Sequence, residues 1–261
     1  GLALAKRGDL DAAIDSYRRA LKINPDYADA FNNMGIALAE RGDIETSILS
    51  YNQAIKINPA LTEAYYNMGN TLTKRGDLDA ALDSYRRALK INPEYVDALN
   101  NMGIALAKRG DLDAALDSYR RALKINPDYA DALNNMGLAL AKRGDLDAAL
   151  DSYRRVLKIN PDYVDAFNNI GIALMEKGDL DAAIDSYQRA LKINVNHIDC
   201  FMNLSSLKVQ LSELSCKAVD PNKNTSDVLC NMLSQNPKHQ INQAIFNFLN
   251  GNLKRSGEYL K

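Results

Sequence analysis

A Gly-Asp pair, a tyrosine and a proline each recur every 34 residues along most of this chain, and this period constrains the fold more than any other feature. The pairs begin at Gly8, Gly42, Gly76, Gly110, Gly144 and Gly178. A period of this size is typical of stacked repeat architectures, in which each repeat contacts its neighbours and all share one elongated core.

Residues 96–129 show what one period encodes. Leu99, Met102 and Leu106 follow one another at intervals of three and four residues, which predicts an amphipathic first helix. A second stripe of small and apolar residues around Tyr119 predicts a second helix. Because one helix pair cannot bury both of its apolar faces, neighbouring pairs must stack on it.

Short signals separate these two helices and end the second one. Gly110 can adopt the left-handed conformation that ends a helix, and Asp111 can cap the helix that follows. Asn126 precedes Pro127, and a residue before proline is driven out of the helical region. Each period therefore predicts a helix-turn-helix hairpin.

Three small residues in the same stretch lie where the paired helices approach closely, since a larger side chain would force the axes apart. With five larger residues they match the tetratricopeptide repeat (TPR) signature: Leu99, Met102, Gly103, Leu106, Ala115, Tyr119, Ala122 and Pro127. The chain resembles this family from Gly1 to about Leu211. The resemblance implies an all-α fold, a right-handed α-solenoid or superhelix of 34-residue helix-turn-helix units. In the family, the first helices line a concave groove.

Counted from the family's usual boundary, a partial repeat precedes five full ones. The partial unit is 1–27, and the full units are 28–61, 62–95, 96–129, 130–163 and 164–197. Residues 198–211 are expected to form one further first helix, so we assign the superhelix to 1–211. The partial unit starts inside its first helix, so this end looks truncated, and its exposed apolar flank is a candidate for self-association.

The last part of the chain, 212–261, departs from the pattern. Residues 212–225 lack the Gly-Asp turn and have the composition of a loop or an irregular helix. Helical patterns return at 226–235 and 240–249, and 254–261 can begin another helix. We expect a degenerate, TPR-like helical cap, because terminal repeats are often atypical. A linker to a further domain is the alternative.

Asparagine occupies the sixth position of every first helix, and the family resemblance places this position on the groove. These residues are Asn33, Asn67, Asn101, Asn135, Asn169 and Asn203. The fifth position is also asparagine in four repeats: Asn32, Asn100, Asn134 and Asn168. Asparagine is a mediocre helix former, so its recurrence needs a reason.

Two explanations remain open for these asparagines. Each amide can bond a neighbouring helix, or the pattern can be inherited by recent duplication. Alternatively, the amides offer donors and acceptors to an extended peptide backbone. The second arrangement resembles the asparagine ladder in the TPR domain of O-linked N-acetylglucosamine transferases.

The second position is acidic in every repeat, as at Asp97, Asp131 and Asp165. An acid there favours the helix dipole, but a row of acids at the groove edge would also repel an acidic tail. TPR cochaperones that grip acidic C-termini carry lysines and an arginine at positions that hold amide, tyrosine or acidic residues here. We therefore expect a protein or peptide partner that is extended and not acidic-tailed.

Composition argues against other classes of function. The 32 basic and 33 acidic residues are balanced, which disfavours nucleic acid and acidic membranes as partners. Cys200, Cys216 and Cys230 lack metal-ligand spacing and indicate idle thiols in a reducing compartment, so we expect a cytoplasmic protein. His197 and His239 lie beside no legible nucleophile, and each is expected to be a solvated loop or helix-start residue. We expect no enzyme activity, no metal site and no cofactor.

The leading hypothesis is a protein-interaction scaffold that binds an extended peptide in the groove through the asparagine ladder. A second is the targeting region of a larger enzyme, such as a glycosyltransferase or a sulfotransferase. A third is a self-assembling scaffold that associates through its truncated N-terminal or C-terminal helices.

Overall fold

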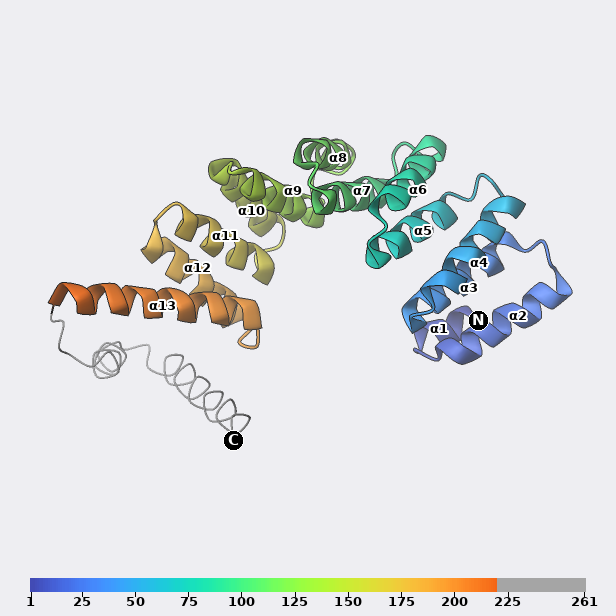
Figure 1. Cartoon of the computed structure of the whole chain (residues 1–261), viewed down its shortest axis with the longest axis horizontal. Coiled ribbons are helices and arrows are strands. Elements are labelled where there is room, and N and C mark those ends of the chain that lie inside the picture. The colour runs from blue at the N-terminus through green and yellow to red at the C-terminus, as the bar shows by residue number, and fades with distance from the viewer. Residues whose placement is uncertain (220–261) are drawn as a thin grey trace, which may run out of the picture. The chain divides into compact units, whose positions relative to one another are not determined.

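The computed structural model describes residues 1–219, which form helices joined by short turns (Figure 1). The chain divides into two compact parts, Gly1–Ile159 and Asn160–Lys261. The first part contains α1 (Leu2–Lys6), α2 (Leu10–Ile23), α3 (Ala28–Arg41), α4 (Ile44–Ile57), α5 (Thr62–Arg75), α6 (Leu78–Ile91), α7 (Val96–Arg109), α8 (Leu112–Ile125), α9 (Ala130–Arg143) and α10 (Leu146–Ile159). The second contains α11 (Val164–Glu176), α12 (Leu180–Ile193) and α13 (Ile198–Val219). The predicted all-α fold is confirmed.

In the first part the helices form antiparallel pairs that stack in chain order. The helix α3 pairs with α4, α5 with α6, α7 with α8, and α9 with α10, and each second helix also packs on the next first helix. Direct contacts also join the successive first helices α3, α5, α7 and α9. The first helices therefore share one side of this part, which carries the predicted site positions.

Close packing of a glycine against a tyrosine joins the two helices of each pair. A Cβ atom placed on Gly103 would lie 2.5 Å from Cε1 of Tyr119, which is closer than carbon atoms can approach. The same contact occurs between Gly35 and Tyr51 and between Gly69 and Tyr85, at 2.6 Å in both. Glycine and tyrosine thus recur with the same period because they contact each other in each helix pair.

The turn between paired helices has the predicted backbone, but the predicted side-chain cap of the second helix forms only in some repeats. Gly110 has φ of 102°, in the left-handed region, and ends α7. Asp111 occupies the N-cap position of α8, but its side chain makes no capping hydrogen bond. Instead, its Oδ2 accepts from Nε of Arg109 at 2.6 Å. The predicted capping is wrong at Asp111, but the equivalent Asp77 and Asp179 accept from the backbone N–H of Ala80 at 3.5 Å and of Ala182 at 3.3 Å.

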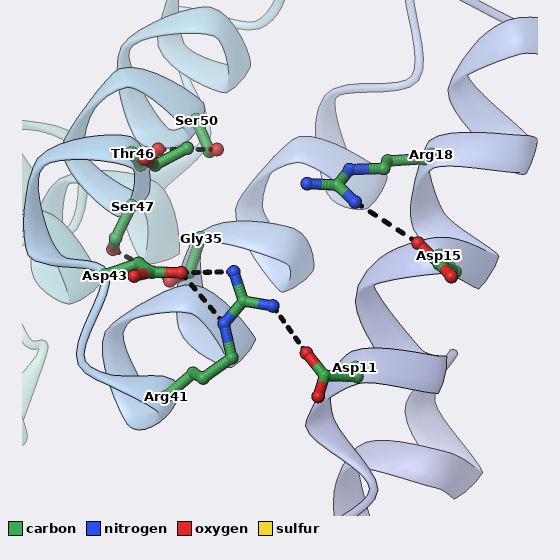
Figure 2. A network of polar contacts seen from close by, with 9 residues as sticks. All are labelled: Asp11, Asp15, Arg18, Gly35, Arg41, Asp43, Thr46, Ser47 and Ser50. Carbon is green, nitrogen blue, oxygen red and sulfur yellow. Dashed lines mark hydrogen bonds and ion pairs between the residues drawn. The ribbon is translucent and has the colours of Figure 1, made fainter.

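The same arginine position links consecutive repeats. Arg41 contacts Asp43 in its own turn and donates to Oδ1 of Asp11, in the preceding repeat, at 2.5 Å (Figure 2). Equivalent bridges join Arg75 to Glu45 and Asp77, Arg109 to Asp79 and Asp111, and Arg143 to Asp113 and Asp145. We call this series the arginine ladder. It links repeats 28–61, 62–95, 96–129 and 130–163 each to the repeat before it, and the sequence pattern did not predict it.

Asparagine side chains contribute to ending the second helices. Asn126 has extended dihedral angles, φ −125° and ψ 94°, and its Oδ1 accepts from the backbone N–H of Asp128 at 3.2 Å. Asn194, which precedes Val195 rather than proline, has nearly the same angles, φ −132° and ψ 97°, and accepts from Asn196 at 3.0 Å. The turn therefore forms without proline, through a side-chain bond that replaces the lost helical one.

The helix α13 is longer than expected. The sequence pattern predicted a first helix to Leu211 and then a loop or an irregular helix, whereas the structure continues α13 to Val219. Position 212 is a serine where the other first helices have the glycine that turns the chain, so no residue there favours a left-handed conformation. The helices expected at 226–235, 240–249 and 254–261 lie outside the described residues. The assignment of 212–261 to a cap therefore stays a prediction.

Candidate functional site

The predicted site positions fall into three classes of exposure along the first helices. The sixth-position asparagines, from Asn33 to Asn203, are all half-buried. The fifth-position asparagines Asn32, Asn100, Asn134 and Asn168 are buried, at 4–7 % exposure. The second-position acids, among them Asp97, Asp131 and Asp165, are exposed. The fifth-position asparagines therefore cannot reach a ligand without rearrangement, whereas residues at the sixth and second positions can.

Neighbouring repeats are joined by hydrogen bonds between sixth- and fifth-position amides. Nδ2 of Asn67 donates to Oδ1 of Asn32 at 3.0 Å, and Nδ2 of Asn135 donates to Oδ1 of Asn100 at 3.1 Å. In the second part of the chain, Nδ2 of Asn203 donates to Oδ1 of Asn168 at 3.0 Å. The fifth-position amide is thus an acceptor that holds the sixth-position amide of the next repeat.

Repeat 62–95 keeps this bond with different residues. Its fifth position is Tyr66 and its ninth is Asn70, and Nδ2 of Asn101 donates to both, at 3.1 Å to the Tyr66 hydroxyl and 2.9 Å to Asn70 Oδ1. Asn70 Oδ1 also accepts from the hydroxyl of Tyr85 at 2.8 Å. The amide of Asn101 is therefore held by two acceptors where Asn67 and Asn135 are held by one.

The second-position acids contact the residue that precedes the next first helix. The hydroxyl of Tyr129 donates to Oδ1 of Asp97 at 2.7 Å. In the equivalent place of the second part, Nε2 of His197 lies 2.9 Å from Oδ1 of Asp165. These contacts leave the carboxylates exposed, so they remain at the edge of the surface that carries the sixth-position amides.

His197 begins a helix, one of the two environments expected for it. Its Nδ1 accepts from the backbone N–H of Cys200 at 3.1 Å and caps α13. Because Nδ1 accepts, Nε2 carries the proton and donates to Asp165. The ring is only half-buried but it is bonded on both sides, which assigns it a structural role. His239 lies outside the described residues.

Cys200 is a structural thiol. Its Sγ donates to the backbone oxygen of Tyr187 at 3.2 Å, and the side chain is fully buried. Burial raises the pKa of this thiol to about 12, so it stays protonated at neutral pH. Cys216 and Cys230 have no described side chains. Within residues 1–219, histidine, cysteine and acidic side chains form no group that could hold a metal ion.

Two TPR sequence profiles match this chain. The profile described as "TPR repeat" matches residues 1–42 and 35–74, and the profile described as "Tetratricopeptide repeat" matches 66–130 and 134–195. The chain belongs to the tetratricopeptide repeat family. TPR arrays are α-solenoids that act as interaction scaffolds, so the predicted fold class is confirmed and an interaction role is indicated. No curated protein sequence matches this chain significantly.

Solved structures agree with this assignment. The TPR protein YrrB, described as having an unusual peptide-binding site, is 25% identical with a TM-score of 0.58, over 72% of this chain and 97% of YrrB. MamA is 28% identical with a TM-score of 0.57, over 61% of this chain and 94% of MamA. The thermophilic TPR protein TTC0263 of Thermus thermophilus, at 23% identity and a TM-score of 0.58, covers 70% of this chain and 99% of its own and supports the TPR fold alone. In residues 1–219, the helices are too short or too polar to cross a membrane.

Proposed function

We propose that this TPR protein is an interaction scaffold that binds an extended segment of another protein along its first helices, through the sixth-position asparagines. The observation that carries the proposal is the bond between a sixth-position amide and an acceptor in the preceding repeat, at 3.0–3.1 Å for Asn67, Asn135 and Asn203. That bond fixes the amide before any ligand arrives, which lowers the entropic cost of binding.

An amide fixed in this way keeps most of its bonding capacity. A side-chain amide has two N–H donors and an oxygen that can accept twice. Asn67 and Asn135 each donate one N–H to the preceding repeat, and the oxygen of Asn101 accepts one bond, from Nδ2 of Asn100 at 3.1 Å. The second N–H and the oxygen can therefore pair with the C=O and N–H of a ligand backbone.

Three sixth-position asparagines of the first compact part, Asn67, Asn101 and Asn135, belong to consecutive repeats. Each backbone bond contributes about 0.5–1.5 kcal/mol net. Several together, less the cost of ordering a flexible segment, correspond to dissociation constants on the order of micromolar. The exposed second-position acids, including Asp131 in α9, disfavour an acidic segment.

One comparison supports this mode of peptide binding, and one further resemblance is still a prediction. YrrB is described as a TPR protein with an unusual peptide-binding site, and it covers most of this chain. The likeness of the sixth-position residues to the asparagine ladder of O-linked N-acetylglucosamine transferases stays a prediction. A soluble cytoplasmic scaffold without catalytic activity is part of the same proposal.

The test uses two variants that break the same inter-repeat bond from opposite ends. Asn135→Ala removes the sixth-position donor, and Asn100→Ala removes its fifth-position acceptor. Both lose the bond between α7 and α9, and Asn100→Ala also loses the bond that its Nδ2 donates to Oδ1 of Asn101, so its stability should fall at least as much. Only Asn135→Ala removes an amide proposed to face the ligand. The probe is a set of peptides selected from a random displayed library on the wild-type chain.

We expect Asn135→Ala to weaken binding of the selected peptides about five- to tenfold, as the loss of one or two net hydrogen bonds predicts. Asn100→Ala should weaken it less. Equal losses for the two variants, or none for either, would remove the role proposed for the sixth position.

A further inference from the structure

Repeat 62–95 differs from its neighbours on the side that carries the sixth-position amides. Tyr66 stands at the fifth position, where repeats 28–61, 96–129 and 130–163 have asparagine, and Asn70 replaces an aliphatic residue at the ninth. The fifth-position asparagines are buried, but Tyr66 is only half-buried, so part of its ring reaches the surface. The otherwise uniform face therefore has one aromatic interruption.

A second tyrosine extends this interruption. The ring of Tyr95, also half-buried, has its centroid 4.9 Å from that of Tyr66, with a tilt of 42° between the planes. The Tyr66 hydroxyl accepts from Asn101, which holds the ring in place. The ring of the buried Tyr85 packs near that of Tyr66, with 6.3 Å between the two centroids. The two rings thus form one aromatic cluster, and both residues are partly exposed.

Two carboxylates lie close to this pair. Burial raises the pKa of Tyr95 to about 12, and the nearby Tyr66 hydroxyl and the charges of Asp97 and Glu63 add to the shift. Both acids are exposed, and neither takes part in the ion pairs described within residues 1–219. Each lies in the first turn of its helix, where the dipole offsets only about half a charge. The two carboxylates therefore place negative charge near the aromatic pair, and Oδ1 of Asp97 also accepts from the hydroxyl of Tyr129.

Replacement of one hydrogen-bond acceptor by another explains only part of this arrangement. The Tyr66 hydroxyl takes the role of the missing fifth-position amide, since it accepts from the sixth-position asparagine of the next repeat. That role needs an oxygen atom but no exposed ring. Tyr95 and Glu63 stand at positions that are tyrosine and acidic in most repeats, so what is particular to repeat 62–95 is the partly exposed Tyr66, whose ring lies 4.9 Å from that of Tyr95.

We propose that Tyr66, Tyr95, Glu63 and Asp97 form a receptor site for one lysine or arginine side chain of the bound segment. A cation binds over the electron-rich faces of tyrosine rings, and the carboxylates attract it and accept its N–H groups. The proposal rests on the peptide-binding function and adds selectivity to it. The sixth-position amides bind any extended backbone, and this site sets the register by placing a basic residue against repeat 62–95.

The variants come from the chain's own repeats. Tyr66→Asn installs the residue found at the fifth position of the neighbouring repeats, and Tyr95→Leu installs the residue found at the same position, Leu61, one repeat earlier. Glu63→Gln removes one charge with little change of shape. The matched control is Tyr163→Leu, because Tyr163 occupies the position of Tyr95 but the fifth position of the preceding first helix is asparagine, Asn134, instead of tyrosine.

The experiment has two arms on the full chain. The first measures binding of one selected peptide carrying arginine, lysine, norleucine or glutamate at the position that contacts repeat 62–95. The second follows the ring resonances of Tyr66 and Tyr95 by NMR while N-acetyl-arginine amide or N-acetyl-norleucine amide is added. The second arm reports on the site whether or not any peptide binds.

We expect the arginine and lysine peptides to bind about three- to tenfold more tightly than the norleucine peptide at low salt. Glutamate should bind worst, and the preference should vanish in Tyr66→Asn, fall in Tyr95→Leu and Glu63→Gln, and persist in Tyr163→Leu. Equal binding of arginine and norleucine peptides by the wild type overturns the site but leaves the scaffold function intact. If no peptide binds, the scaffold function fails, and the ring resonances alone then decide whether the site takes a cation.

Discussion

Repeats 62–95 and 96–129 have the same helix lengths, the same glycine-tyrosine contact and the same arginine bridges, yet their first helices present different surfaces. In repeat 96–129 the fifth position is a buried amide, and in 62–95 it is a half-exposed tyrosine. The contacts that build the solenoid lie between the helices of a pair and at the turns. The fifth and ninth positions can therefore change without changing the fold, which is where this array acquires a distinctive feature.

Substitutions in the glycine-tyrosine contact that both repeats share are expected to reduce stability the most. Gly103→Ala places a methyl group 2.5 Å from the Tyr119 ring, and Gly69→Ala places one 2.6 Å from Tyr85. Each should destabilise its repeat by about 1–3 kcal/mol, as overpacking of a dense core does. Hydrogen exchange of the amides in the affected helix pair measures the loss locally, which suits a repeat array that need not unfold in one step.

The exposed Ala114→Ser serves as the control and should change exchange little. Tyr119→Leu should make Gly103→Ala less costly, because it removes the ring that the methyl group meets. Additive losses in that double variant would contradict the contact as the cause.

The next largest effect should separate the two repeats at the sixth position. Asn101 donates to two acceptors in repeat 62–95, whereas Asn135 donates to one in repeat 96–129. Asn101→Ala leaves two acceptors without a donor and Asn135→Ala leaves one. The free energy of unfolding should therefore fall by about 1–2 kcal/mol for Asn101→Ala and by about 0.5–1.5 kcal/mol for Asn135→Ala. Denaturant unfolding of both variants checks the order, and a larger loss for Asn135→Ala would be inconsistent with the bonds described.

The end of the second helix should depend more on asparagine than on proline in both repeats. Asn126→Ala removes the bond to the N–H of Asp128 and should cost about 1 kcal/mol. Pro127→Ala should reduce stability much less than Asn126→Ala does, because Asn194 makes the same turn before Val195. Thermal unfolding distinguishes the two variants, and a larger loss for Pro127→Ala would restore proline as the main stop signal.

The arginine ladder should give the smallest effect. The acids that Arg109 reaches are largely exposed, so solvent and salt weaken the bridges. Arg109→Ala should lower the melting temperature slightly at low salt and not at all at high salt. Arg75→Ala, in repeat 62–95, should behave alike. A loss that persists at high salt would mean that the arginine stem contributes by packing.

The 34-residue period was enough to predict the helix pairs, the Gly-Asp turns and the family, because each depends on local residue types. Contacts between repeats were harder to predict. The bridge from Arg41 to Asp11 and the bond from Asn67 to Asn32 join residues 30 and 35 positions apart, and nothing in one repeat indicates which neighbour is reached. For the same reason, the sequence did not predict which site residues are buried and which are exposed. Burial of Asn100 and half-exposure of Asn101 depend on the adjacent repeat, although the two are neighbours in sequence.

The role of the sixth-position amides can be observed directly by NMR of the asparagine side chains. When a selected peptide is added, the NH2 resonances of Asn67, Asn101 and Asn135 should shift and become protected from exchange, while that of Asn100, buried and already bonded, should change much less. Binding of the peptide with no change at the sixth-position resonances would contradict recognition through these amides.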